Sequence, residues 1–356
     1  MRARTLSIVT VVAAAAATVG AGPSTAAPSA PVESRQHFVQ LGDSFSSGNG
    51  AGSYEEKSCW RSPNNYGARV AQLKGATYTN AACSGGVTAD ILQPRDIGSP
   101  SWRTRTYRIP AGAVDARAQW LARAKADHLC GTPAQPDFSY VYTLSSSASA
   151  GDLYTATVRC QLQAAPQIDA VDRSTDAVFV TTGGNDVGFT SIVIDCLVLR
   201  AAGSCKARID AANVELTSLK PRLVETLQAV HDRSGGRAHL YLLGYPHLIN
   251  TDSFRLSSTY DAGQELSRMQ LRGDTLQGAA MAELSRANGG QGGFTFVDVK
   301  RDWGGYTHGI DPHVVANNSN AWLVPVLAPG RELKEFVHPT AAGWGASALA
   351  LADAMR

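Results

Sequence analysis

The segment His37-Phe38-Val39-Gln40-Leu41-Gly42-Asp43-Ser44 decides the fold. It is a short apolar run that ends in a glycine turn and a serine, a pattern typical of a buried strand that feeds a turn. Three further apolar runs follow, and the first two of them also end in glycine turns: 177–181, 239–243 and 294–298. Runs that are apolar at nearly every position indicate strands that helices cover on both faces.

Helical stretches separate these strands, and they lie at 65–73, 209–233, 265–287 and 340–355. The alternation of strand and helix predicts an α/β sandwich built on a parallel sheet. In such sheets, functional residues gather beyond the carboxyl ends of the strands. The candidates just past a predicted strand end are Ser44, Gly85 (after a strand at 77–81), Asn185 and Tyr245.

Residues 92–166 break this rhythm. Two segments there alternate as strands do, at 138–144 and 153–159, and residues 145–151 connect them. We therefore expect an inserted β-hairpin.

The insertion also carries two cysteines and three large aromatic residues. Cys130 and Cys160 are expected to tie the base of the hairpin together. Trp102, Trp120 and Tyr107 either line an acyl groove or pack within the insertion, and packing is the favoured interpretation.

The amino-terminus resembles a secretory signal peptide, which we assign to residues 1–27. Two arginines precede an apolar run at 6–19, and small residues follow up to a cut near Ala26 or Ala27. The run is shorter than the roughly 20 residues that span a bilayer, although an uncleaved anchor remains the alternative. No later stretch resembles a transmembrane helix. The sequence thus predicts a secreted, extracellular protein.

The composition indicates a globular protein with a full core. Of the 356 residues, 44% are hydrophobic and 17% are charged, which excludes a disordered chain. We expect one domain over 28–356 that contains the insertion. The net charge is +2, and Arg2 and Arg4 account for it, so the mature protein is neutral. Nucleic-acid binding normally needs a basic footprint and is disfavoured. We expect a monomer.

The six cysteines are Cys59, Cys83, Cys130, Cys160, Cys196 and Cys205. An exported chain meets oxidising conditions, so they indicate disulfides, and the absence of a CxxC pair argues against a thiolate metal site. Six cysteines allow 15 pairings. Order along the chain favours the local pairs Cys59–Cys83, Cys130–Cys160 and Cys196–Cys205.

Four separated clusters carry residues suited to acyl transfer, and they lie at 42–48, 80–86, 183–186 and 335–340. A serine hydroxyl is a weak nucleophile until a base accepts its proton, and the neutral imidazole of His338 is the candidate base for Ser44. The oxyanion that follows needs donors, which glycine-turn N–H groups and an Asn amide supply. The pattern differs from the Gly-x-Ser-x-Gly elbow, because position 46 is serine.

Together the four clusters resemble the SGNH hydrolases, the GDSL family of esterases and lipases. Gly42-Asp43-Ser44 matches the first motif of that family, although Phe45 stands where leucine is usual. Gly85, Asn185 and His338 match the second, third and fifth motifs, and the resemblance spans about residues 36 to 350. The leader and six cysteines are most similar to its secreted, three-disulfide bacterial lipases. The resemblance implies a flavodoxin-like, three-layer α/β/α sandwich.

The resemblance also implies roles. Ser44 would be the nucleophile and His338 the general base, and the oxyanion hole would combine the N–H groups of Ser44 and Gly85 with the Asn185 amide. The family usually has Asp three residues before the histidine, where this chain has Glu335. Either the carboxylate or the backbone carbonyl of Glu335 would orient His338. The chemistry needs no cofactor and no metal.

The sequence therefore predicts a serine esterase or lipase that acts on lipid or small acyl esters. Within this class, a phospholipase A-type activity and a carbohydrate O-deacetylase are the alternatives. A secreted binding module that keeps the fold without the chemistry is a further alternative, and labelling by a serine-directed probe distinguishes it.

Overall fold

A computed structural model describes residues 35–290, 293–314, 318–326 and 328–356. The signal peptide that we assign to residues 1–27 lies outside the described residues. Residues 35–356 form one compact unit. No helix in the described part of the chain combines the length and the apolar character that crossing a bilayer requires.

Five parallel strands form the central sheet, in the order β2-β1-β7-β8-β11. Their bounds are β1 (His37–Gly42), β2 (Thr77–Asn80), β7 (Ala177–Thr181), β8 (His239–Leu243) and β11 (Phe294–Val297). Counted among themselves, these strands follow the flavodoxin-like order 2-1-3-4-5. The parallel sheet predicted from the apolar runs is confirmed.

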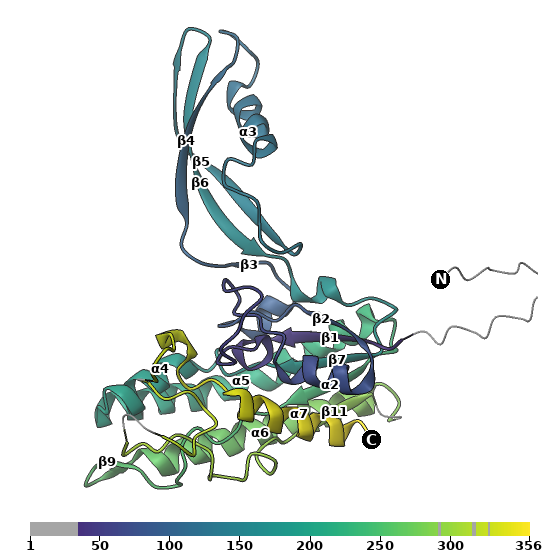
Figure 1. The fold of residues 1–356 in the computed structure, drawn as a ribbon, viewed down its shortest axis with the longest axis vertical. Helices are drawn as coiled ribbons and strands as arrows, with labels where there is room; N and C mark the ends of the chain where they lie inside the picture. Colours follow the sequence, from purple (N-terminus) through teal and green to yellow (C-terminus); the bar gives the residue numbers. More distant parts are fainter. Residues whose placement is uncertain (1–34, 291–292, 315–317, 327) are drawn as a thin grey trace, which may run out of the picture. The chain divides into compact units, whose positions relative to one another are not determined.

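Helices cover both faces of this sheet, as Figure 1 shows. They are α2 (Tyr66–Lys74) and α7 (Ala341–Ala354) on one face and α5 (Ala202–Arg233) and α6 (Ala262–Ala287) on the other. A side chain at Gly67 of α2 would meet the ring of Phe179 at 3.1 Å, so this helix lies close against the sheet. On the opposite face, Val178 packs in one cluster with Leu227 of α5 and Met281 of α6. The three-layer α/β/α arrangement is confirmed.

The shorter elements connect these layers. They are α1 (Ser44–Ser47), η1 (Thr88–Ile91), η2 (Gln167–Ala170), α4 (Phe189–Val193), the π-helix η3 (Ile194–Val198), β9 (Arg255–Ser257), β10 (Tyr260–Asp261) and η4 (Leu333–Glu335). The caps of α2 follow the sequence closely. The Asn65 side chain accepts from the N–H of Ala68, and Gly75 ends the helix with φ 65°.

The insertion is larger than the hairpin that the sequence predicts. Its elements are β3 (Arg95–Asp96), β4 (Ser101–Arg108), α3 (Ala116–Ala126), β5 (Phe138–Ala150) and β6 (Leu153–Ala164). Strand β6 pairs antiparallel with β5 on one side and with β3 and β4 on the other. Residues 145–151, expected as the connection, are mostly strand, and the register shifts between Leu144 and Ser146. This run of serine and alanine is exposed and gives no alternating pattern.

The disulfide of the insertion does not tie its base, which corrects the expectation. Cys160 lies within β6 opposite Ser101 and Tyr142, and Cys130 follows α3, so the bridge fastens the helix end to the middle of the sheet. Trp120 of α3 is buried in one hydrophobic cluster with Cys130 and Cys160, and its indole N–H donates to the carbonyl of Arg105 at 3.0 Å.

Packing is thus the role of two of the three aromatic residues. Tyr107 lies edge-on to Trp120 with ring centroids 5.8 Å apart, whereas Trp102 is 55% exposed. None of the three belongs to the residues that line the cleft described below.

A buried arginine joins the insertion to the central sheet. Arg61 forms a bidentate pair with Asp137 at 2.7 and 2.9 Å, and it also donates to the carbonyls of Ala81 and Ala82 just after β2. Because these bonds are charge-assisted and sheltered, they hold the start of β5 against the loop that follows β2.

Candidate active site

Ser44 is the first residue of α1, directly after the central strand β1. Gly42, the last residue of β1, has φ 116°, and a side chain there would come within 2.1 Å of the carbonyl oxygen of Thr181. Only glycine fits this close approach to β7. The turn therefore places Ser44 at the carboxyl end of the sheet, between β1 and β7, where the chain order of the strands reverses.

The Asp43 side chain holds this turn through hydrogen bonds. Its Oδ1 accepts from the N–H of Phe45 at 2.8 Å, and its Oδ2 accepts from the Tyr245 hydroxyl at 2.5 Å. That hydroxyl in turn accepts from the N–H of Gly184 at 2.9 Å. Burial raises the pKa of Asp43 to about 7, although the bonds from Tyr245 and Phe45 oppose the shift. Asp43 thus links the ends of β1, β7 and β8.

Gly85 lies in the loop after β2, and its neighbours hold it. Gly85 itself has φ 80°. The N–H of the preceding Ser84 donates to the carbonyl oxygen of Cys59 at 2.9 Å, and the Arg95 guanidinium donates to the Ser84 carbonyl at 3.0 Å. Within the described residues, the main-chain N–H groups of Ser44 and Gly85 have no acceptor. Both groups are therefore available as donors.

Asn185 follows β7, and its amide is oriented by a hydrogen bond. Nδ2 donates to the carbonyl of Gly86 at 2.8 Å, which leaves the second N–H of the amide unused by that bond. The next residue, Asp186, accepts from the N–H and the hydroxyl of Thr88 at 2.9 and 3.0 Å. These bonds join the loop after β7 to the loop after β2.

His338 lies in a tightly held segment before α7. Val337 has φ 58°, which is unfavourable for a β-branched residue and is retained where the surroundings enforce it. The N–H of Val337 donates to the carbonyl oxygen of Val324, and the N–H of Val324 donates to the carbonyl oxygen of His338, both at 2.9 Å. The imidazole lies 5.4 Å from the ring of Phe45, measured between centroids.

The surroundings keep the His338 imidazole neutral. Burial lowers its pKa to about 4, while the backbone of Phe336 and Glu335 and the charge of Glu335 act in the opposite direction. Nδ1 is buried and has no hydrogen-bond partner in the described part of the chain. A neutral imidazole is the form that accepts a proton.

The Glu335 carboxylate has other partners than His338. Oε1 accepts from the Tyr54 hydroxyl and from Arg331 at 2.9 Å, and Oε2 accepts from the N–H of Glu332 at 2.8 Å. Burial alone would raise the pKa of Glu335, but these donors lower it below its usual value. The carboxylate fastens the His338 segment to the loop after α1, because the Tyr54 hydroxyl also accepts from the N–H of Gly50 at 3.0 Å.

The predicted residues meet in one cleft. Ser44, Gly85, Asn185 and His338 all line it, and its volume is about 510 Å³. Apolar side chains form much of the remaining wall: Trp60, Ile97, Phe189, Val193, Ile194, Val198, Val326, Leu333, Phe336 and Val337. Glu335 is not among the lining residues. No group of three or more His, Cys, Asp or Glu in the described residues could hold a metal ion.

Several known proteins are similar to this chain in sequence or in fold. The chain is 26% identical to Lipase 1 of Streptomyces coelicolor over 74% of its length and 88% of the relative. It is 26% identical to a lipase of Streptomyces rimosus over 89% of its length and 86% of that protein. No protein-family profile matches the chain.

Two crystal structures have a similar fold. They are an extracellular lipase from Streptomyces rimosus, 23% identical, and a phospholipase A1 from Streptomyces albidoflavus, 21% identical. Each covers 90% of this chain and is itself covered completely, with a TM-score of 0.56. The chain is thus similar in sequence to Streptomyces lipases, and its fold is that of a lipase and a phospholipase A1.

The three disulfides expected from the sequence are present. The structure contains Cys59–Cys83, Cys130–Cys160 and Cys196–Cys205, the pairs that order along the chain favours. The first bridge ends two residues before Gly85. It therefore braces the loop that presents the Gly85 N–H.

Asn49 is a residue of this site that the sequence analysis missed. Its side chain is 1% exposed, and Nδ2 donates to the Ser84 hydroxyl at 3.1 Å and to the Lys334 carbonyl at 2.9 Å. Asn49 thus ties the loop after Ser44 to the Gly85 loop and to the His338 segment. In the sequence, its place between Gly48 and Gly50 indicates a turn but gives no sign of these contacts.

Proposed function

We propose that the protein is a serine carboxylic ester hydrolase with lipase or phospholipase A-type specificity. The observation that supports this most directly is the cleft that Ser44, Gly85, Asn185 and His338 share. These four residues come from three neighbouring strand ends and one distant segment, and together they supply a nucleophile, a base and oxyanion donors.

In the proposed reaction, the Ser44 hydroxyl attacks the acyl carbon of the ester while Nε2 of His338 accepts its proton. The carbonyl oxygen becomes an oxyanion, which accepts from the N–H groups of Ser44 and Gly85 and from the Asn185 amide. Collapse of the intermediate forms the acyl-enzyme and expels the alcohol, which receives the proton from His338. A water molecule, activated by the same imidazole, then releases the acid and restores Ser44.

Orientation of His338 is assigned to the backbone in this proposal. The Glu335 carboxylate is occupied by Tyr54, Arg331 and Glu332, and the main-chain hydrogen bonds with Val324 hold the His338 segment. Glu335 is then a positioning residue. It holds the His338 segment in place, and its carboxylate takes no part in proton transfer.

The apolar wall of the cleft favours acyl chains over acetylated sugars. Ile97, Val193, Ile194 and Val198 line the cleft together with polar residues such as Arg95 and Lys334, and a largely apolar pocket suits an acyl chain. A carbohydrate O-deacetylase remains the second candidate on family grounds alone. The relatives named as lipases and as phospholipase A1 support the first.

We further propose a secreted, monomeric enzyme. Three disulfides are typical of proteins that fold in oxidising compartments. A single chain supplies all four cleft residues, so the chemistry needs no second copy. Light scattering of the purified protein checks the monomer.

The test uses Ser44→Ala and a serine-directed phosphonate. The variant is expected to lose hydrolysis of p-nitrophenyl esters, and the phosphonate is expected to label Ser44 in the native protein. Asn185→Ala is expected to lose roughly 10²–10³ in kcat, because one oxyanion donor is removed. Unchanged turnover in Ser44→Ala would overturn the assignment.

The substrate class is tested with acyl esters of increasing length beside acetylated xylan. Higher kcat/KM on longer chains is the expected result. A sharp preference for acetyl groups on xylan would instead establish the O-deacetylase.

A further inference from the structure

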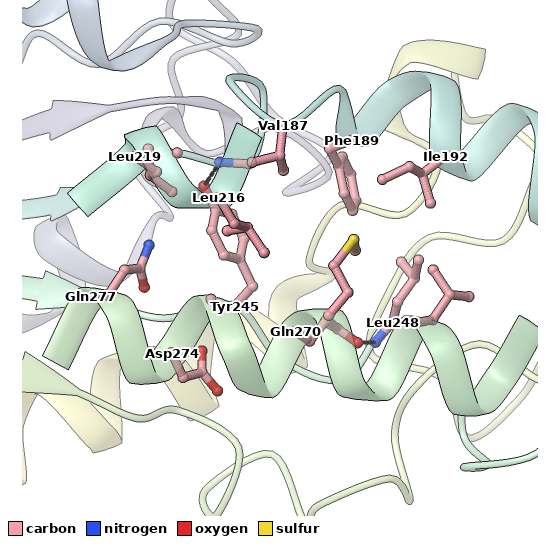
Figure 2. A pocket seen from close by; sticks show the side chains of 15 residues that line it. Val187, Phe189, Ile192, Leu216, Leu219, Tyr245, Leu248, Gln270, Asp274 and Gln277 are labelled. Carbon is pink, nitrogen blue, oxygen red and sulfur yellow. Dashed lines mark hydrogen bonds between the residues drawn. The ribbon is translucent and has the colours of Figure 1, made fainter. Parts of the chain in front are cut away.

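A second cavity lies behind one wall of the cleft, between the loop after β7 and the helices α5 and α6. Its volume is about 70 Å³. Figure 2 shows Phe189 and Ile192 pointing from α4 toward the side chains of α6 on the other side. Most of the lining is apolar: Val187, Phe189, Ile192, Leu216, Leu219, Leu248, Leu266 and Met269.

Most of the polar groups around this cavity are bonded to other groups. Gln270 donates to the carbonyl of Pro246 at 2.8 Å, and Asp274 is paired with Lys300. Gln277 donates to the carbonyl of Thr182 at 3.0 Å, while its Oε1 is buried without a partner in the described residues. Because most of its lining is apolar, the cavity suits an apolar guest.

Phe189 belongs to the wall of the cavity and to the wall of the catalytic cleft. Its ring lies edge-on to Phe45 at 6.2 Å, and Phe45 lies 5.2 Å from Tyr245 and 5.4 Å from His338. The partition between the two spaces is therefore a group of aromatic rings beside the proposed base.

Phe189 lies at the start of a short helix, and its N–H donates to the carbonyl of Gly184 at 3.1 Å. Phe189 begins α4, a helix of 5 residues, and the preceding Gly188 has φ 77° and provides no side-chain cap. A π-helix follows directly, a conformation that is rare and is often found at functional sites. At such a helix start, the Phe189 side chain can change its rotamer and the local backbone can shift at a small cost in free energy.

A glycine keeps the cavity open from the other side. Gly273 lies within α6, where glycine costs about 1 kcal/mol relative to alanine. A side chain there would meet only a methyl group of Leu216, at 4.0 Å. The helix thus gives up stability at a position where a larger residue would fit and would fill the cavity.

We propose that this cavity receives the terminal carbons of the substrate acyl chain, with Phe189 as the movable partition. The inference rests on the proposed ester hydrolase function. A cavity of about 150 Å³ binds benzene, so 70 Å³ has room for about three carbon atoms. The cleft holds the earlier part of the chain, and the cavity adds a preference for chains long enough to reach past Phe189.

The kinetic test compares Gly273→Leu with the native enzyme on p-nitrophenyl esters from acetate to palmitate. We expect kcat/KM to fall about tenfold or more on the long chains and to stay unchanged on acetate. Gly203→Leu is the matched control, because Gly203 is an exposed glycine of α5 with nothing within 4 Å of a side chain. A uniform loss across all chain lengths, or no loss at all, would overturn the assignment.

Phe189→Ala provides an independent kinetic test. Removal of the partition should raise the activity on long chains relative to acetate, the opposite of the Gly273→Leu result. An unchanged chain-length profile in a variant with native circular dichroism would count against the partition.

A binding test separates this inference from the ester hydrolase proposal. Sodium decanoate, kept below its micelle concentration, is titrated into Ser44→Ala by calorimetry. The same titration is made with Ser44→Ala combined with Gly273→Leu, and with Gly203→Leu as control. We expect decanoate to bind Ser44→Ala and to bind the Gly273→Leu form at least about tenfold more weakly. Equal affinities would overturn the cavity assignment, even if no ester is hydrolysed by the native protein.

Discussion

At the scale of single residues, the two proposed reacting groups are held in different ways. Ser44 depends on Gly42, because no other residue could pass so close to the carbonyl of Thr181. His338 depends on Val337, whose backbone adopts the left-handed region without the freedom of glycine. Two hydrogen bonds to Val324 enforce that conformation. The imidazole position is therefore determined by its backbone rather than by a charged partner.

The pH dependence of activity follows from the environment of His338. Burial lowers its pKa to about 4, and only the neutral imidazole accepts the Ser44 proton. We expect kcat/KM for a short soluble ester to be constant near neutral pH and to fall as the pH drops through about 4. A pH profile of kcat/KM, with circular dichroism at each pH, measures this. A fall centred near 6.5, the ordinary pKa of a histidine side chain, would contradict the prediction.

Glu335→Gln tests which group orients the imidazole. Glutamine can still accept from Tyr54 and Arg331 through its carbonyl oxygen, so we expect kcat to fall less than about tenfold. Loss of a true triad carboxylate by amide substitution costs about 10⁴ in kcat. A loss of that size, without loss of melting temperature, would restore the carboxylate role. Tyr54→Phe is the matched control for the shared hydrogen bond.

At the scale of elements, two disulfides of similar span serve different parts of the fold. Cys59–Cys83 spans 24 positions and ends beside Gly85, whereas Cys130–Cys160 spans 30 and lies in the insertion. Their contributions to stability should be nearly equal, about 2–4 kcal/mol each. If removal of one bridge lowers activity more than removal of the other, the difference then reflects where the bridge lies relative to the site.

We expect the double variant Cys59→Ala/Cys83→Ala to lose about 10²-fold in kcat, because a small displacement of an oxyanion donor is costly. Cys130→Ala/Cys160→Ala should keep most of its kcat. Both are assayed at a temperature where circular dichroism shows native structure. Equal losses would mean that the first bridge has no local role at the site.

The strands and helices of the central sandwich were predictable because local signals agree with the tertiary fold. The apolar runs at β1, β7 and β8 match the observed strands to within one residue. Helix α5 starts at Ala202, seven residues before the predicted start. Residues 202–208 lack a clear apolar periodicity, and the helix there packs through Cys205 and its disulfide. That contact is tertiary and leaves no pattern in the local sequence.

The site was predictable where residues lie at strand ends and was missed where they join distant segments. Ser44, Gly85 and Asn185 follow strands and stand beside glycines. Asn49 bonds to the carbonyl of Lys334, 285 positions away, and Tyr54 bonds to Glu335, 281 positions away. Such pairings depend on how loops meet in space. For the same reason, spacing alone could not show that the Glu335 carboxylate bonds to Tyr54 and Arg331.

At the scale of the whole molecule, the strand order explains why one cleft gathers the four residues. Strands β2, β1 and β7 are neighbours, so the loops after them present Gly85, Ser44 and Asn185 side by side. His338 arrives from the segment before α7. The charge is nearly balanced across the chain, so the site owes its properties to burial and hydrogen bonding and not to a strong net field.

The insertion has a hydrophobic cluster of its own, centred on Trp120 and Val158 and closed by its own bridge. Yet its first residues, Arg95 to Gly98, form part of the cleft wall. A module that is self-supporting in this way can accumulate substitutions without disturbing the sheet. Evolution can therefore retune what enters the cleft while leaving the reaction itself untouched.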